Sequence, residues 1–192
     1  MSKKIMFNDK FGLTQAVLDG RKTMTRRISE DQIRNSIFCK SGYESIHGYE
    51  IKPKYKVGEV VAIAQSYESV YNEKGLETMD MLVSWLKNHK GWQNKLFVAA
   101  GYMIHHIRIT DIKIERLQDI SDEDCMKDGI IHAYTNNNGI KIYHTPHTKR
   151  GYLSTDVAQE AFAFLINKVS GKGTWESNPY VFVYEFERIE KQ

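Results

Sequence analysis

Apolar residues that alternate with polar ones, or that follow one another without interruption, predict several β-strands. The expected strands cover residues 3–7, 60–67, 104–117 and 180–188. The segment 60–67 is almost continuously apolar, so we expect it in the interior of a sheet, whereas 3–7 is expected at an edge. The alternation along 104–117 changes phase after Ile109, which predicts a β-bulge or bend near Thr110 and Asp111.

Apolar residues spaced three and four positions apart predict helices between these strands. The expected helices cover residues 8–19, 76–89 and 121–129, and a last helix is capped by residues 154–156 and runs through Val169. Gly20 follows the first helix, where a left-handed residue is needed, and Ser121 and Gly129 bound the third. The stripe expected to be buried in the last helix consists of Val157, Ala161, Phe164, Leu165 and Val169.

This order of elements contains no regular alternation of strands and helices and no internal repeat. It predicts one α+β domain over residues 1–192, a small, partly closed, mixed β-barrel decorated by helices. We expect residues 68–100 to be a helical insertion and the polar segment 130–152 to be a hairpin or a mobile loop. The oligomeric state and the role of the insertion, over the functional site or against a partner subunit, stay open.

The composition indicates a soluble cytoplasmic protein. Hydrophobic residues make up 41% and charged residues 27% of the chain, and no apolar run reaches the length of a membrane span or signal peptide. The net charge of +3 is too small for a protein that coats nucleic acid by bulk charge, so an anion site must be local. Cys39 and Cys125 lack metal-ligand spacing, which suits a reducing compartment.

We expect no metal site and no cofactor. His105 and His106 are adjacent on an expected strand and therefore point to opposite faces. His144 and His147 lie in a polar loop without a third ligand nearby. That loop also carries basic residues, which indicate either contact with a nucleic-acid backbone or, more simply, a solvated loop.

The most unusual stretch of the chain is the basic segment 20–27, which holds four cations and two hydroxyls without an acid. We interpret residues 22–26 as extended. A period of two places Lys22 and Thr25 on opposite faces, unless the turn after Gly20 rotates Lys22. The segment predicts an edge that attracts anions; the alternative is a solvated face whose cations pair with neighbouring acids.

The sequence Gly20-Arg21-Lys22-Thr23-Met24-Thr25-Arg26-Arg27 resembles the Gly-x-Lys-x-x-Thr-x-Arg motif of ASCH domains, a PUA-like β-barrel family associated with RNA. Further segments agree in order and spacing with a longer subgroup from bacteria and their phages. They are residues 57–59, 109–121, 128–129 and 175–181. The resemblance covers nearly the whole chain and implies a PUA-like fold that binds RNA, a nucleotide or a nucleoside.

The resemblance also implies residues for a site. A small bacterial member of the superfamily deacetylates N4-acetylcytidine with a Lys and a Thr of the motif and a downstream Glu. The matching positions here are Lys22, Thr25 and Asp128, an Asp in place of the Glu. The strand end that reads Arg-Glu-Thr-Trp in the subgroup is Ala64-Gln65-Ser66-Tyr67 in this chain. The residues expected to bind ligand or nucleic acid are Arg21, Lys22, Thr23, Arg26, Arg27, Gln65 and Tyr67.

Three hypotheses for the function follow. The first is a non-catalytic domain that binds RNA or a nucleotide or nucleoside through the basic segment. The second is an amidohydrolase that deacylates an N4-acylated cytidine-type nucleoside, with Lys22, Thr25 and Asp128 as catalytic residues. The third is an accessory protein of phage origin in which the motif is a remnant. The sequence does not distinguish RNA, DNA and free nucleoside.

Overall fold

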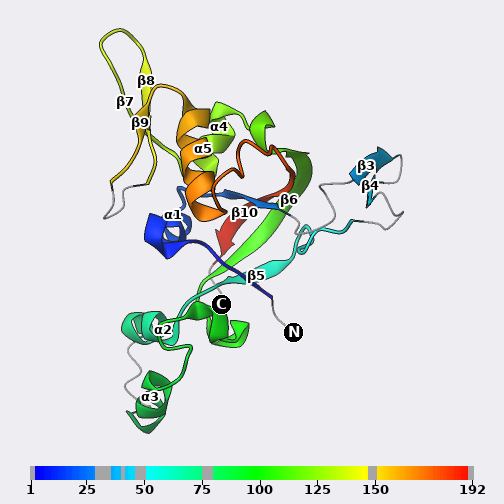
Figure 1. The fold of residues 1–192 in the computed structure, drawn as a ribbon. Helices are drawn as coiled ribbons and strands as arrows, with labels where there is room; N and C mark the ends of the chain where they lie inside the picture. Colours follow the sequence, from blue (N-terminus) through cyan, green and yellow to red (C-terminus); the bar gives the residue numbers. More distant parts are fainter. Residues whose placement is uncertain are drawn as a thin grey trace.

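The computed structural model shows an α+β fold with a five-stranded sheet at its centre (Figure 1). It describes residues 3–28, 36–39, 42–45, 51–74, 80–146 and 151–189, and of residues 36–39, 42–45 and 80–83 it describes the backbone alone. Among the described residues, no helix is long and apolar enough to cross a membrane.

The central sheet is mixed. Its strands, in spatial order, are β1 (Lys4–Ile5), β5 (Val60–Ile63), β6 (His106–Arg116), β10 (Tyr180–Ile189) and β2 (Met24–Ile28). β1 runs parallel to β5, and every other neighbouring pair is antiparallel. The edge position expected for the first strand and the interior position expected for 60–67 are therefore confirmed.

A β-bulge interrupts the long pairing of β6 with β10. Glu185 lies opposite Asp111 and the next residue, Phe186, lies opposite Ile109, so Thr110 is the additional residue on β6. The change of hydrophobic phase in the sequence thus marks a real bulge, because one extra residue exchanges the two faces of a strand.

The expected barrel is not closed by strand pairing in the described part of the chain. β1 and β2 form the two edges of an open sheet. The edges are nevertheless linked beyond the end of β1, where the Arg27 Nη2 donates a hydrogen bond of 2.6 Å to the Met6 carbonyl. β1 comprises only Lys4 and Ile5, and in the described part of the chain it pairs with β5 alone. What the structure establishes is a mixed, open sheet.

Helices cover the sheet on the side of its β2 edge (Figure 1). They are α1 (Leu13–Leu18), α4 (Asp122–Lys127) and α5 (Ala158–Val169), with a 3₁₀ turn at Asp9–Phe11 before α1. Gly20 follows α1 with φ of 74°, and Ser121 caps α4 by accepting from the Asp124 N–H, as the sequence predicts.

The buried face of α5 differs from the expected stripe. Its buried residues are Ala158, Ala161, Phe162 and Leu165. Val157 and Phe164, which we expected to be buried, are 40% and 38% exposed, so that part of the prediction is wrong. The helix begins only at Ala158, because Thr155 bonds the Val157 N–H and the Glu160 carboxylate just before it. This start and the packing of Phe162 set the helical phase.

The remaining elements lie around this body. The segment 68–100 contains most of α2 (Tyr67–Lys74), α3 (Asp80–Lys87) and a 3₁₀ turn at Lys95–Phe97, and a second turn follows at Ala100–Tyr102. A small sheet consists of β7 (Ile131–Thr135), β8 (Lys141–His144) and β9 (Ser154–Thr155). The expected hairpin is thus β7–β8, whereas mobility of 130–152 and the status of 68–100 as an insertion stay predictions. Before β5 in the chain, β3 (Ser36–Cys39) pairs with β4 (Gly42–Ser45).

Candidate functional site at the β2 edge

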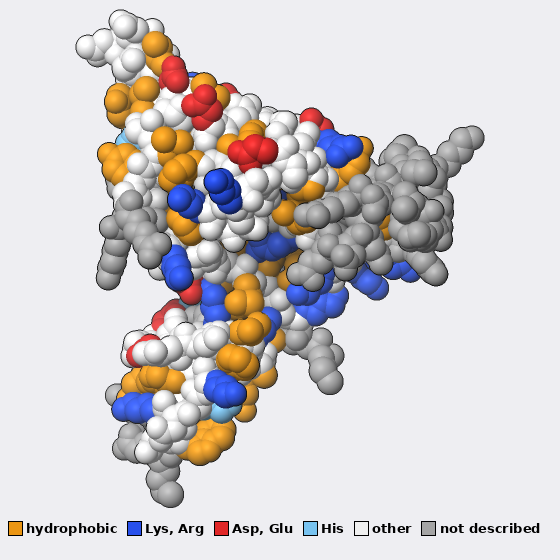
Figure 2. All heavy atoms as spheres, in the orientation of Figure 1, with side chains coloured by type: hydrophobic (Ala, Val, Ile, Leu, Met, Phe, Trp, Pro, Cys, Tyr) orange, Lys and Arg blue, Asp and Glu red, His pale blue; other side chains and the backbone are white. Residues whose placement is uncertain are grey.

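A half-open cavity of about 240 Å³ lies between β2, the segment that follows β1, and the ends of α4 and α5. Its polar wall includes Lys22, Thr25, Arg26, Arg27 and Asp128, together with Asn8 and Ser170. Its apolar wall includes Phe7, Leu13, Phe162, Leu165, Ile166 and Val169. In Figure 2, basic side chains lie recessed between the upper part of the molecule, which carries α4 and α5, and the lower part, which carries α2 and α3. The fold therefore gathers most of the basic segment at one cavity.

Lys22 lies just before β2, and its backbone orientation is set by two neighbouring helices. Its own N–H donates to the Ala16 carbonyl at 2.9 Å, and the Thr23 N–H donates to the Lys127 carbonyl at 3.0 Å. The regular period of a strand does not apply there, because β2 begins only at Met24. Lys22 and Thr25 therefore line the same cavity. Of the two alternatives considered from the sequence, this is the one in which the turn after Gly20 rotates Lys22 toward the side of Thr25.

The Lys22 side chain is 2% exposed and ends at Asp128, the residue that follows α4. Its ammonium donates to the Asp128 carbonyl at 2.6 Å and also to the Asp128 Oδ1. Burial lowers the pKa of Lys22, and the Asp128 carboxylate only partly offsets this effect. A cation at the C-terminal end of a helix is also favoured by the exposed carbonyls there.

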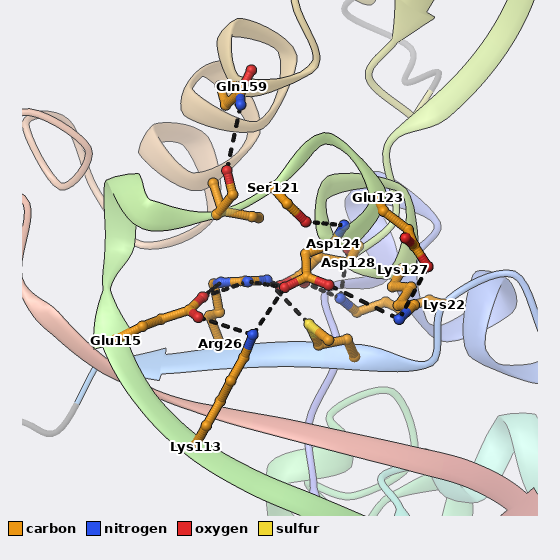
Figure 3. Close-up of polar contacts among 12 residues, drawn as sticks. Lys22, Arg26, Lys113, Glu115, Ser121, Glu123, Asp124, Lys127, Asp128 and Gln159 are labelled. Atoms are coloured by element: carbon orange, nitrogen blue, oxygen red, sulfur yellow. Dashed lines mark hydrogen bonds and ion pairs between the residues drawn. The ribbon is translucent and has the colours of Figure 1, made fainter.

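Arg26 lies between three carboxylates, as Figure 3 shows. Its Nη1 donates to the Asp128 Oδ2 at 2.9 Å, and its Nη2 donates to Asp124 at 3.2 Å. Its Nε and Nη2 both donate to the Glu115 Oε1, at 3.0 and 2.6 Å. Lys113 extends the network with ion pairs to Glu115 and Asp124 at 3.0 and 3.1 Å, and Lys127 pairs with Asp124 and Glu123 at 4.0 and 3.4 Å.

All the donors of Arg26 are used within the protein, since its remaining Nη1 hydrogen faces the Met24 sulfur at 3.4 Å. Burial acts to lower the pKa of Arg26, but the surrounding carboxylates outweigh burial and raise it. Arg26 therefore orients Asp128 for Lys22, and a ligand would have to displace a carboxylate to bind its guanidinium.

Thr25 and Arg27 have polar groups that the protein leaves available to the cavity. Among the described residues, the Thr25 hydroxyl has no hydrogen-bond partner, although the residue is 2% exposed. Arg27 donates to the Met6 and Arg26 carbonyls at 2.6 and 3.2 Å, and its guanidinium lies 5.6 Å from the centre of the Phe7 ring. Burial lowers the pKa of Arg27.

Two other expected site residues of the basic segment lie outside the cavity. Arg21 is exposed, pairs with Asp19 at 2.9 Å and borders a second cavity of about 380 Å³ beside α4. Thr23 contributes its backbone, since its N–H bonds Lys127 and its carbonyl accepts from the Phe186 N–H at 2.9 Å. The structure thus brings Lys22, Thr25, Arg26, Arg27 and Asp128 together, and leaves Arg21 and Thr23 apart.

The residues expected at the end of the interior strand also lie elsewhere. Gln65 is buried, and its Oε1 accepts hydrogen bonds from the backbone N–H groups of Ile104 and His105 at 3.0 and 3.3 Å. These bonds fix the backbone just before β6. Tyr67 begins α2 and packs edge-on against Tyr102, with ring centres 5.7 Å apart. His147, considered above for a metal site, lies outside the described residues.

The sequence interpretation missed the outer part of the ionic network. Glu115 and Asp124 hold Arg26, yet they are 89 and 98 positions away from it in the chain. The only available signals were the acidic first turn of α4 and the polar end of β6. Neither signal indicates a partner, because the pairing depends on how the helix packs over the sheet.

Comparison with known proteins assigns no family. No family model matches the chain, and no curated protein matches it. Among solved structures, the fold is similar to the crystal structure of the protein EF3133 from Enterococcus faecalis V583, described with the family model DUF984. The TM-score is 0.45 at 12% identity, over 99% of this chain and 82% of that one. A similarity of this degree carries no functional conclusion.

Proposed function

We propose that the chain is an ASCH-type, PUA-like domain that binds a nucleobase-containing ligand, as a nucleoside, a nucleotide or a residue of RNA, in the β2-edge cavity. The observation that carries the proposal is the division of this cavity into an apolar wall and a polar wall in which Lys22, Thr25 and Arg27 keep donors available. Planar bases combine apolar faces with ring-nitrogen and carbonyl acceptors at their edges. The two walls match these two properties.

The donors that remain available support this assignment. An ammonium has three N–H donors, and Lys22 uses two of its donors on Asp128. A guanidinium has five, and Arg27 uses two on backbone carbonyls. Together with the Thr25 hydroxyl, these groups offer a ligand several donors and few acceptors. A ligand rich in acceptors is therefore favoured.

The size of the cavity favours one base over a length of polynucleotide. Its volume of about 240 Å³ lies below the range of about 300–1,000 Å³ that is typical of sites for drug-sized ligands. A single ring system fits a site of this size, with any sugar and phosphate at the open side. An RNA ligand would accordingly insert one unstacked base.

The test is calorimetric titration of the protein with the four common nucleosides, their monophosphates, N4-acetylcytidine and short RNA oligonucleotides. We expect at least one ligand to bind, and Thr25→Val to weaken its binding. The matched control is Thr23→Val, because the Thr23 side chain lies outside the cavity. RNA binding should weaken as salt rises. If the folded protein binds none of these ligands, the proposal is wrong and the accessory-protein hypothesis gains support.

A second candidate function is hydrolysis of an N-acylated nucleobase, favoured by the meeting of Lys22, Thr25 and Asp128 in one cavity. In this scheme the Thr25 hydroxyl adds to the acyl carbonyl, and its proton passes to the Lys22 amine, whose pKa is lowered by burial. The C–N bond then breaks as the base nitrogen takes up this proton. Water hydrolyses the acyl-threonine ester, which releases the acid and restores the hydroxyl.

A deacylation assay on N4-acetylcytidine tests this candidate. We expect turnover in the wild type, its loss in Thr25→Ala and Lys22→Ala, and its retention in Thr23→Ala. Circular dichroism would confirm that each variant is folded. A folded wild type without turnover would rule out this substrate, whereas turnover that persists in Thr25→Ala would rule out the threonine nucleophile.

A further inference from the structure

Charge counting around the cavity identifies one cation that the protein does not neutralise. The cavity and the ionic network beside it contain five cations, Lys22, Arg26, Arg27, Lys113 and Lys127, and four carboxylates, Glu115, Glu123, Asp124 and Asp128. Every member of the network except Arg27 forms an ion pair within it. Among the described residues, no carboxylate lies within ion-pair distance of Arg27, so the balance of the cluster is one positive charge.

The position of the Arg27 guanidinium is nevertheless well fixed. Backbone carbonyls of Met6 and Arg26 each accept one of its hydrogen bonds, and the Phe7 ring lies beside it. Because Met6 and Phe7 also line the cavity, the group is held at the cavity wall. Three of its five N–H donors have no protein partner in the described part of the chain.

We infer that Arg27 binds a phosphoryl group of the ligand, so that the cavity takes a phosphorylated nucleoside and not a neutral one. This inference rests on the proposed function and names the class of its ligand. A phosphate presents several acceptor oxygens in a geometry that a guanidinium matches with paired hydrogen bonds. It would also supply the negative charge that the surrounding residues lack.

The energetics of burial favour such an anion. Arg27 is partly buried, and a cation that loses part of its hydration without a counter-ion is disfavoured, so this burial lowers the pKa of Arg27. The Asp128 carboxylate acts to raise the pKa of Arg27, but its two oxygens already accept hydrogen bonds from Lys22 and Arg26. The last turn of α5 reaches the rim at Ser170, where helix carbonyls favour positive charge, so we place the phosphate at Arg27 and not at that rim.

The test compares each nucleoside with its 5′- and 3′-monophosphates, and with a trinucleotide that contains the same base, by calorimetric titration. We expect a phosphorylated form to bind at least tenfold more tightly than the nucleoside. Arg27→Gln should abolish this advantage, so that the variant binds the nucleoside and its monophosphates with equal affinity. Arg21→Gln, at an exposed arginine outside the cavity, should preserve the advantage and is the matched control.

The outcomes separate the two proposals. The inference would be overturned, while the proposed function stands, if nucleoside and monophosphate bound with equal affinity. It would also be overturned if the tighter binding of the phosphorylated form survived in Arg27→Gln. Binding of the trinucleotide alone, with dependence on Arg27, would assign the phosphoryl group to RNA. No binding of any form would overturn both. If Arg27→Gln fails to fold, the wild-type comparison still decides whether a phosphoryl group is required.

Discussion

The buried ammonium of Lys22 donates hydrogen bonds to both the backbone carbonyl and the side-chain carboxylate of Asp128, a residue 106 positions away in the chain. This contact joins the start of β2 to the end of α4. It also fixes Lys22 in the cavity beside Thr25. One ionic interaction therefore serves the fold and arranges the candidate site.

Removal of this ion pair should destabilise the protein. Lys22→Met leaves Asp128 buried with Arg26 as its remaining partner, and we expect a loss of about 3 kcal/mol in the free energy of unfolding. Arg21→Met breaks only an exposed pair and should cost less than about 1 kcal/mol. Urea denaturation followed by circular dichroism measures both values.

The same measurement on a double variant separates the pair from its surroundings. In Lys22→Met/Asp128→Asn the loss should be smaller than the sum of the two single losses by more than about 1 kcal/mol, because the two residues share one interaction. Strict additivity would show that the contact contributes little to stability.

The orientation of α5 predicts losses of stability of very different size for two phenylalanines that are two positions apart. Phe162→Ala should destabilise the protein by about 3–5 kcal/mol, because this side chain is buried and its ring lies 6.1 Å from that of Trp175. Phe164→Ala, at an exposed position, should cost less than about 1 kcal/mol. Thermal unfolding of the two variants provides the comparison, and equal losses would contradict the observed helix orientation.

Alkaline pH should destabilise the protein through Tyr55. Burial raises the pKa of Tyr55 from 10.0 to about 12, and its hydroxyl donates to the Lys4 carbonyl at 2.9 Å. Since the folded state disfavours the phenolate, the contribution of Tyr55 is fully present below pH 10.0 and is lost as the pH rises to about 12. The loss corresponds to about 2–3 kcal/mol.

The control for this pH effect is Tyr55→Phe. The variant lacks the titrating group, so its free energy of unfolding should fall less steeply than that of the wild type over this pH range. Denaturant titrations at several alkaline pH values measure the difference. Parallel pH profiles for the two proteins would contradict the assignment to Tyr55.

Cys125 should be chemically inert in the folded protein. It is fully buried, and burial raises the pKa of its thiol from 9.0 to about 12, which lowers the thiolate fraction at about pH 8 by about a thousandfold. In a Cys39→Ser background, iodoacetamide should modify the native protein far more slowly than the denatured one. Equal rates would indicate frequent opening around α4.

Much of the architecture follows from the sequence because its signals are local. The order of strands and helices reflects the hydrophobic period, and the bulge at Thr110 reflects a change in that period. The left-handed Gly20 and the cap at Ser121 depend on the sterics and hydrogen bonding of a few adjacent residues. The resemblance to the ASCH motif likewise selected Lys22 and Thr25, which line one cavity.

The tertiary structure alone decided which of these signals meet. The phase of α5 depends on where the helix starts and what it packs against, so local spacing gave the wrong positions for Val157 and Phe164. Arg26 and Arg27 are neighbours of the same chemical type, yet one is enclosed by three carboxylates and the other has none among the described residues. The sequence shows both as equivalent cations. Their difference arises because α4, the residue that follows it and β6 bring distant acids to the side chain of Arg26.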